Sequence, residues 1–204
     1  MKKFQIGQNS LDVCKVILDH HPEISTVRLI THKVKTNWRQ RYQTPSEKLK
    51  NMLAGFEHPQ PIKKQQYSRK KFDQLSLDDL RNLKTNQVWS ITSKIQTTDG
   101  QAKHLAMMNF HPENASLQDI KKALKYICGN KSGVLLDSGR FWHYYGDFLL
   151  SENEWIQFMV EFLMPTVLVS PRYISHGLYN NYNTLRLTTN DKYKPKIPEV
   201  IEII

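Results

Sequence analysis

Beyond residue 86 the apolar side chains switch between a two-residue and a 3.6-residue period, so this part of the chain has to combine strands with helices. Residues 88–95 alternate between two sets of side chains and are rich in β-branched types, which predicts a strand. Asp99-Gly100 is a hairpin-turn signal, and residues 104–110 supply a second, more apolar strand. We therefore expect a strand pair across 88–110.

Two helices are predicted by serine caps followed by apolar stripes. Ser116 with Asp119 opens the first, and Gly129 fits its C-terminal cap. Ser151 with Glu154 opens the second, whose aromatic stripe is typical of a core. Further strands are expected at 133–137, 141–145, 166–169 and 185–188. The order of elements predicts an α+β fold with a mixed or antiparallel sheet and packed helices.

Residues 1–84 are predicted to form a helical and loop-rich N-terminal region, and residues 85–204 the α+β core. Near the end of the first part, Ser76 and Asp79 resemble a capping pair that precedes leucines at helical spacing, so we expect a helix there. The whole chain of 204 residues is also short enough to fold as one unit.

The net charge of +10 favours binding to a polyanion such as nucleic acid, although solubility, an acidic protein or a membrane surface are alternative explanations. Basic residues interleaved with aromatic ones suit a nucleic-acid strand, because cations track phosphate and rings stack bases. The alternative is a solvated surface with the tryptophan packed inward. The predicted nucleic-acid-binding residues are Lys63, Lys64, Arg69, Lys70, Lys71 and Trp38.

Cysteine usage and hydropathy favour a cytoplasmic, intracellular protein without membrane association. The two cysteines, Cys14 and Cys128, do not form a metal-type pair, and a reducing compartment is the default for such a chain. The N-terminal residues after Lys3 are polar rather than apolar, which argues against a signal peptide. No stretch approaches the roughly 20 apolar residues that span a bilayer.

The segment with the most specific chemistry is Ser138-Gly139-Arg140-Phe141-Trp142-His143, which joins two predicted strands. A Ser-Gly turn followed by arginine brings backbone N–H groups and a guanidinium together, and this combination suits phosphate oxygens. His143 follows on the next strand and is expected to contact a triphosphate or a sugar.

This segment resembles the second motif of the archaeo-eukaryotic primase superfamily, Ser-Gly-Arg-Gly-x-His, which binds the incoming nucleotide. The stretch from Arg172 to His176, followed by Arg186, resembles the third-motif region. The resemblance covers residues 86–199 and implies a primase-like core similar to that of RNA-recognition motifs. The nucleotide- or phosphate-binding residues that it implies are Ser138, Gly139, Arg140, His143, Arg172, His176 and Arg186.

The first motif of that superfamily ends in Asp-x-Asp, and together with a third carboxylate it holds two Mg²⁺ or Mn²⁺ ions. Here Asn109 and His111 occupy the matching positions, and Ser170 stands at the third. Asn is a weak ligand for a hard cation, and His favours softer metals. Asp137 is the carboxylate that, with His111, would hold a single ion. The metal candidates are thus Asn109, His111 and Asp137, and the catalytic candidates His111, Asp137 and His143.

Three hypotheses follow. The first is a catalytically degenerate primase-like module that binds nucleic acid or nucleotide as a subunit of a larger DNA- or RNA-processing assembly. The second is an active primase or primase-polymerase with a reduced metal site that uses Mg²⁺ or Mn²⁺. The third is an interaction module in which the fold serves only to dock a protein partner.

Overall fold

The computed structural model describes residues 2–33, 46, 61–81, 83, 87–112, 115–190, 194 and 196–204. Five helices lie in these ranges: α1 (Ser10–His20), α3 (Arg69–Asp73), α4 (Leu117–Cys128), α5 (Glu152–Glu161) and α6 (Pro171–Asn180). The nine strands of the same ranges are β1 (Ile24–Lys33), β2 (Lys63–Ser68), β3 (Gln87–Thr92), β4 (Lys94–Thr97), β5 (Ala102–Phe110), β6 (Gly133–Asp137), β7 (Trp142–Leu150), β8 (Thr184–Arg186) and β9 (Glu199–Ile203). They form one sheet of an α+β protein.

The strands follow the order β8-β3-β1-β4-β5-β7-β6-β9, with β2 paired to β1, and each pair is antiparallel. Residues 1–84 contribute β1 and β2 to the same sheet as the rest. Every described strand thereby pairs with a neighbour in one sheet, which leaves few buried backbone groups without hydrogen-bond partners.

The sheet divides at Ser93, the single residue between β3 and β4. On the side away from β1, β3 pairs with β8, whereas β4 pairs with β5. Asn183 fastens the division: its backbone N donates to Ser93 Oγ at 3.1 Å, and its Nδ2 donates to the Met107 carbonyl at 2.6 Å. Buried side-chain bonds of this kind fix backbone position where the ladder is interrupted. They hold the start of β8 against β5.

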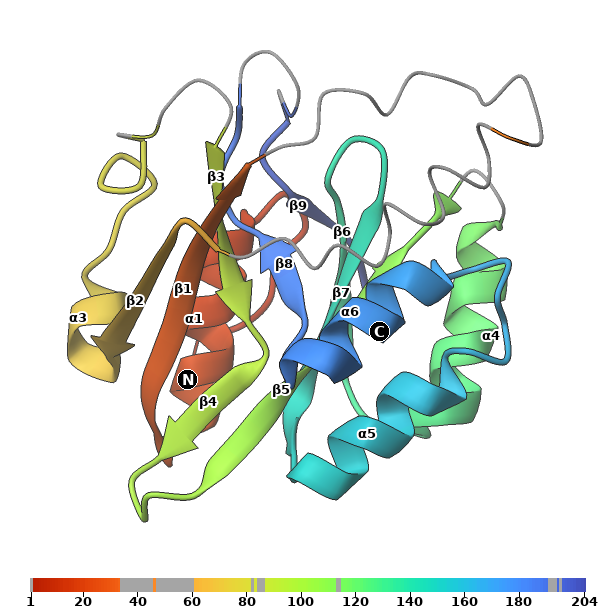
Figure 1. The fold of residues 1–204 in the computed structure, drawn as a ribbon, viewed down its shortest axis with the longest axis horizontal. Helices are drawn as coiled ribbons and strands as arrows, with labels where there is room; N and C mark the ends of the chain where they lie inside the picture. Colours follow the sequence, from red (N-terminus) through yellow and green to blue (C-terminus); the bar gives the residue numbers. More distant parts are fainter. Residues whose placement is uncertain are drawn as a thin grey trace.

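Helices cover both faces of the sheet and enclose two apolar cores (Figure 1). Side chains alternate along β5, so Leu105 and Met107 pack with α1 on one face. Met108 and Phe110 pack with α4, α5 and α6 on the other. The central strands are buried on both sides, which explains why β5 to β7 read as apolar runs.

The predicted elements beyond residue 86 are largely confirmed. Both α4 and α5 begin at capping boxes, formed by Ser116 with Asp119 and by Ser151 with Glu154. The hairpin at Asp99-Gly100 joins β4 to β5, and Gly100 has the positive φ of 81° that its turn requires.

Three expectations about secondary structure are wrong, and two elements were not predicted. Residues 24–33 and 63–68 are strands, although a helical and loop-rich region was predicted there. Ser76 and Asp79 form the capping contact, but only a turn follows. Most of 166–169 is turn, with an isolated bridge between Val169 and Phe110. Helix α6 and strand β9 were not predicted. Long-range pairing, which local patterns do not reveal, decides each strand.

No helix among the described residues is long and apolar enough to cross a membrane.

An ion-paired cluster joins the end of α1 to β7. Asp147 Oδ2 lies 2.7 Å from His20 Nδ1, and Asp147 Oδ1 lies 3.5 Å from His21 Nε2. The hydrogen bond with Asp147 is the largest cause of the raised pKa of His21. Burial lowers the pKa of His20, but bonds to Lys2 and Asp147 outweigh it and raise the pKa. Burial likewise raises the pKa of Asp147, and the two histidines outweigh it and lower the pKa.

These directions set a pH window for stability. The raised histidine pKa values contribute stability that is complete below the ordinary 6.5 and is lost as the pH rises through the folded values. The lowered pKa of Asp147 contributes stability that is present above the ordinary 3.8 and is lost as the pH falls through the folded value. The cluster therefore stabilises the fold most between about pH 3.8 and pH 6.5, the ordinary pKa values of aspartate and histidine.

We predict that Asp147→Asn lowers the free energy of unfolding by about 1–3 kcal/mol near pH 5.5, and by clearly less at pH 9. Urea melts at both pH values measure the difference. Asp73→Asn, which breaks an exposed pair with Lys2, serves as control. A loss of equal size at both pH values would show that the histidine charges play no part.

Candidate phosphate-binding site

The Ser138–Arg140 segment forms a tight turn between β6 and β7. Ser138 closes it, because its backbone N and its Oγ both donate to the Phe141 carbonyl, at 2.9 and 2.7 Å. Gly139 has φ +98°, which a residue with a side chain adopts only under strain, and its N donates to Asp137 Oδ1 at 2.7 Å. Arg140 is exposed at the tip, with its guanidinium carbon 5.5 Å from the centre of the Phe141 ring.

Arg186 supports this turn from β8. Its guanidinium is buried and donates to three backbone carbonyls: Ser138 at 2.7 Å, Lys196 at 2.8 Å and Thr188 at 2.6 Å. Among the described residues it forms no ion pair with a carboxylate. Burial lowers the pKa of Arg186 to about 10, which still leaves it charged at neutral pH. In the described part of the chain this buried cation is held by carbonyls alone, so no described carboxylate offsets its charge behind the turn.

Two lysines near the C-terminus add to this charge. Lys194 Nζ lies 5.3 Å from the centre of the Phe141 ring. Its pKa is lowered to about 8, first by burial and then by the charges of Arg186 and Arg140. Lys196 Nζ lies 2.6 Å from Asp137 Oδ2. Neither lysine was predicted from the sequence, although their alternation in the tail was a signal that could have found them.

Among the described residues, four cations and two carboxylates thus lie around the turn. The cations are Arg140, Arg186, Lys194 and Lys196. The carboxylates are Asp137, bound to Lys196, and Glu199, which is exposed opposite Asp137 in the β6–β9 ladder. Burial, and then Arg186 and Lys194, also lower the pKa of His32 on β1 to about 4. A partly buried region with excess positive charge favours an anion.

His143 and Asn109 face each other across β7 and β5, where they are paired in register. His143 is 4% exposed, and burial, reinforced by Arg186 and Lys194, lowers its pKa well below the ordinary value. His143 Nδ1 and Asn109 Oδ1 are buried atoms that lack a hydrogen-bond partner in the described part of the chain. Directly opposed residues have Cβ atoms about 5 Å apart, so the two side chains are neighbours on one face of the sheet.

The three positions that would carry metal carboxylates lie close together. His111 follows Asn109 at the end of β5, and its backbone N donates to the Leu168 carbonyl at 2.8 Å. That contact and the Phe110–Val169 bridge place Ser170 beside the same strand end. The His111 ring packs edge-on against Phe141, with centroids 4.6 Å apart. The first-motif positions and the Ser138 turn therefore lie near one another.

The side chains at these positions do not fit a two-metal centre. Both oxygens of Asp137, the nearby carboxylate, are engaged by Gly139 N and Lys196 Nζ. The described residues contain no group of three or more His, Cys, Asp or Glu side chains that could hold a metal ion. Asn109, His111 and Ser170 supply no negative charge, whereas Mg²⁺ and Mn²⁺ require anionic oxygen ligands.

The remaining predicted residues lie on other elements. Arg172 Nε donates to His176 Nε2 at 3.3 Å, so these two form an (i, i+4) pair on α6. Lys63 and Lys64 lie on β2, and Arg69, Lys70 and Lys71 on the adjacent α3. All but Arg69, which donates to the His21 carbonyl at 3.0 Å, are exposed. Trp38 lies outside the described residues.

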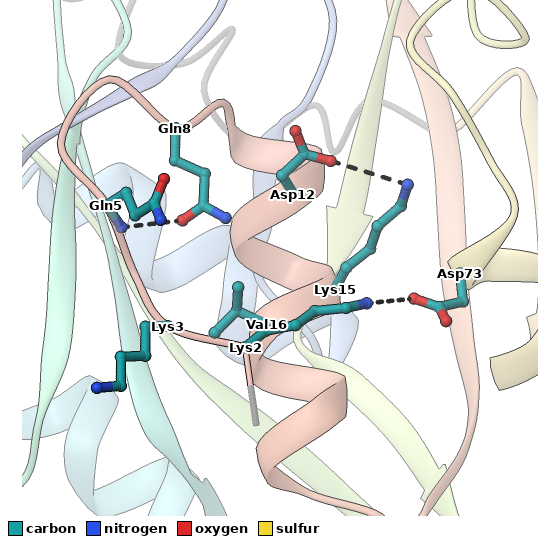
Figure 2. Close-up of a pocket in the computed structure, with 8 residues that line it drawn as sticks. All are labelled: Lys2, Lys3, Gln5, Gln8, Asp12, Lys15, Val16 and Asp73. Atoms are coloured by element: carbon teal, nitrogen blue, oxygen red, sulfur yellow. Dashed lines mark hydrogen bonds and ion pairs between the residues drawn. The ribbon is translucent and has the colours of Figure 1, made fainter.

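A surface pocket beside α1 contains none of the predicted residues. Figure 2 shows its lining, in which Lys2 pairs with Asp73 at 3.0 Å and Lys15 with Asp12 at 3.8 Å. The carboxylates neutralise two of its three lysines, so the pocket lacks the excess of charge found around the Ser138 turn.

A family model described as archaeo-eukaryotic primase 1D-like matches residues 68–199, well over half of the chain. The matched span contains the Ser138 turn, Asn109, His143, Arg186 and both lysines of the site. No curated protein and no solved structure matches the chain.

Proposed function

The chain belongs to the archaeo-eukaryotic primase 1D-like family, and from this premise we propose that it is a catalytically degenerate member that binds nucleotides or nucleic-acid ends through their phosphates. Membership of the family implies that the chain binds nucleic acid. The finer proposal is that the Ser138 turn binds the phosphates and that the bound nucleotide or strand end is not turned over.

The observation that carries the proposal is the gathering of Arg140, Arg186 and Lys194 around the Ser138 turn, where the cations of the described residues outnumber the carboxylates. Arg186 donates to the Ser138 carbonyl and Ser138 Oγ donates to the Phe141 carbonyl, so the backbone of the turn is held in place and presents Arg140 at its tip. A preorganised turn that presents cations binds phosphate without the cost of ordering a loop. Ser138 and Gly139 shape the receptor, and Arg140 and Lys194 supply charge at its surface.

The donor set argues against catalysis. Phosphoryl transfer by two metal ions needs carboxylates that neutralise the ions at close range. Asn109, His111 and Ser170 replace them, and Asp137 is bound to Lys196. An active primase or primase-polymerase, with His111, Asp137 and His143 as its catalytic groups, is the second candidate. Template-dependent synthesis with Mg²⁺ or Mn²⁺ distinguishes it from the degenerate module.

A module without catalysis implies that other subunits perform the chemistry. We therefore propose that the chain works as a subunit of a larger DNA- or RNA-processing assembly. The exposed lysines belong to β2 and α3. These elements lie at one edge of the sheet, away from β6 and β7, which carry the Ser138 turn (Figure 1). They offer a second contact along a nucleic-acid strand, with Arg172, His176 and Trp38 as further proposed contacts.

We predict that Arg140→Ala weakens the binding of a deoxynucleoside triphosphate at least about tenfold, because a charge-assisted phosphate contact is lost. Isothermal titration calorimetry measures the affinity. Arg140 is exposed, so the melting temperature should hardly change. Arg81→Ala removes the same charge from an exposed pair with Asp78 and serves as control. Equal affinities of Arg140→Ala and the wild type would exclude the role of Arg140.

The basic surface is tested through salt dependence. Each phosphate contact with a single strand contributes about 0.7 to the slope of log K against log salt concentration. We predict that Lys64→Gln combined with Lys70→Gln reduces the slope by about 1.4 for a single-stranded oligonucleotide. Lys122→Gln with Lys125→Gln, exposed on α4, changes the net charge equally and should leave the slope unaltered. If both pairs act alike, only the total charge matters.

A further inference from the structure

No carboxylate stands at the expected metal positions, Asn109, His111 and Ser170. The inference that follows concerns how phosphate binds there, and it rests on the proposed function. We infer that this site takes a phosphoryl group directly as the anion, without a divalent cation, and that Asn109 is the residue that permits this. The ligand is a terminal phosphate, supplied either by a free nucleotide or by the 5′ end of a strand.

The first support is the source of the positive charge. Arg186 is buried and has no carboxylate partner among the described residues, and Lys194 and Arg140 flank the same Phe141 ring. These are permanent or nearly permanent cations attached to the chain. They supply the charge that metal ions would bring to a carboxylate-lined site. An added divalent cation would meet like charge without anionic ligands.

The second support is the pair of buried polar atoms that lack partners. Unsatisfied buried atoms are uncommon, and each one costs free energy unless a ligand or water completes it. Asn109 Oδ1 accepts hydrogen bonds, and His143 Nδ1 can donate or accept according to its tautomer. The strand register places both on one face, next to the cations. Together they suit a polar, hydroxyl-bearing ligand such as a protonated phosphate oxygen or a sugar hydroxyl.

Asn109 is decisive because an aspartate of the same shape would make the site prefer a divalent cation to a bare phosphate. A carboxylate at this position would repel phosphate and attract a divalent cation. The amide keeps the volume and the acceptor oxygen but removes the charge. Asn109 thus acts as a specificity-determining residue, which favours the bare anion over the metal chelate.

The test measures the affinity of the full chain for inorganic pyrophosphate, a deoxynucleoside triphosphate, and a 5′-phosphorylated oligonucleotide compared with its 5′-hydroxyl form. Each titration is performed in EDTA and again in Mg²⁺. The wild type should bind at least one phosphate ligand in EDTA, no more than about twofold more weakly than in Mg²⁺. The pair of oligonucleotides and the free nucleotide distinguish the two sources of the phosphate.

Asn109→Asp should weaken binding in EDTA at least about tenfold, with partial recovery in Mg²⁺. Asn153→Asp, exposed on α5, adds the same charge elsewhere and should bind like the wild type. Wild-type binding that disappears in EDTA and returns with Mg²⁺ would overturn the inference but leave the proposed function intact. Absence of binding under both conditions would overturn the proposed function itself. The wild-type comparison does not depend on whether the variant folds.

Discussion

Three hydrogen bonds from one buried guanidinium hold the site together. Arg186, the last residue of β8, connects the Ser138 turn to Thr188 and to the C-terminal segment at Lys196. The turn lies 48 residues before Arg186 in the chain, so its bond to Arg186 is the long-range one. Because arginine stays charged even when buried, the same contacts that order the turn also fix a positive charge behind it. Structural order and attraction for anions therefore have one origin.

The division of the sheet explains how Arg186 reaches this position. With β3 and β4 parted at Ser93, β8 pairs with β3 while its start is bonded to β5 through Asn183. A continuous strand in place of the division would leave no room for β8 near the centre of the sheet. The strand carries Arg186 toward His143 and the turn, where its charge lowers the pKa of both His143 and Lys194 after burial. Fold and electrostatics are linked at this point.

Local sequence patterns predicted the elements that local interactions determine, namely capped helices and tight turns. Capping residues located α4 and α5, and the Ser-Gly-Arg turn was recognised because its backbone requirement is contained in a few residues. Strand β2 was missed because its polar residues, such as Lys63, carry little strand signal, and its pairing with β1 makes it a strand. Strands β1 and β9 contain the β-branched residues that favour strands, so their sequences held a signal that the predictions for residues 1–84 and for the tail did not use. The alternating lysines of the tail were visible in the sequence, but their place beside Phe141 was not, since the fold brings the tail there.

We propose that the cationic cluster around His143 binds a phosphate without a divalent cation. The most direct test is to follow the His143 ring by nitrogen-detected NMR titration, with and without pyrophosphate in EDTA. We expect a pKa well below the ordinary 6.5 in the free protein, because His143 is buried beside Arg186 and Lys194. The pKa of His143 should rise when phosphate brings opposite charge. A ring that titrates near 6.5 without ligand, or that ignores phosphate while the protein binds it, would contradict the account.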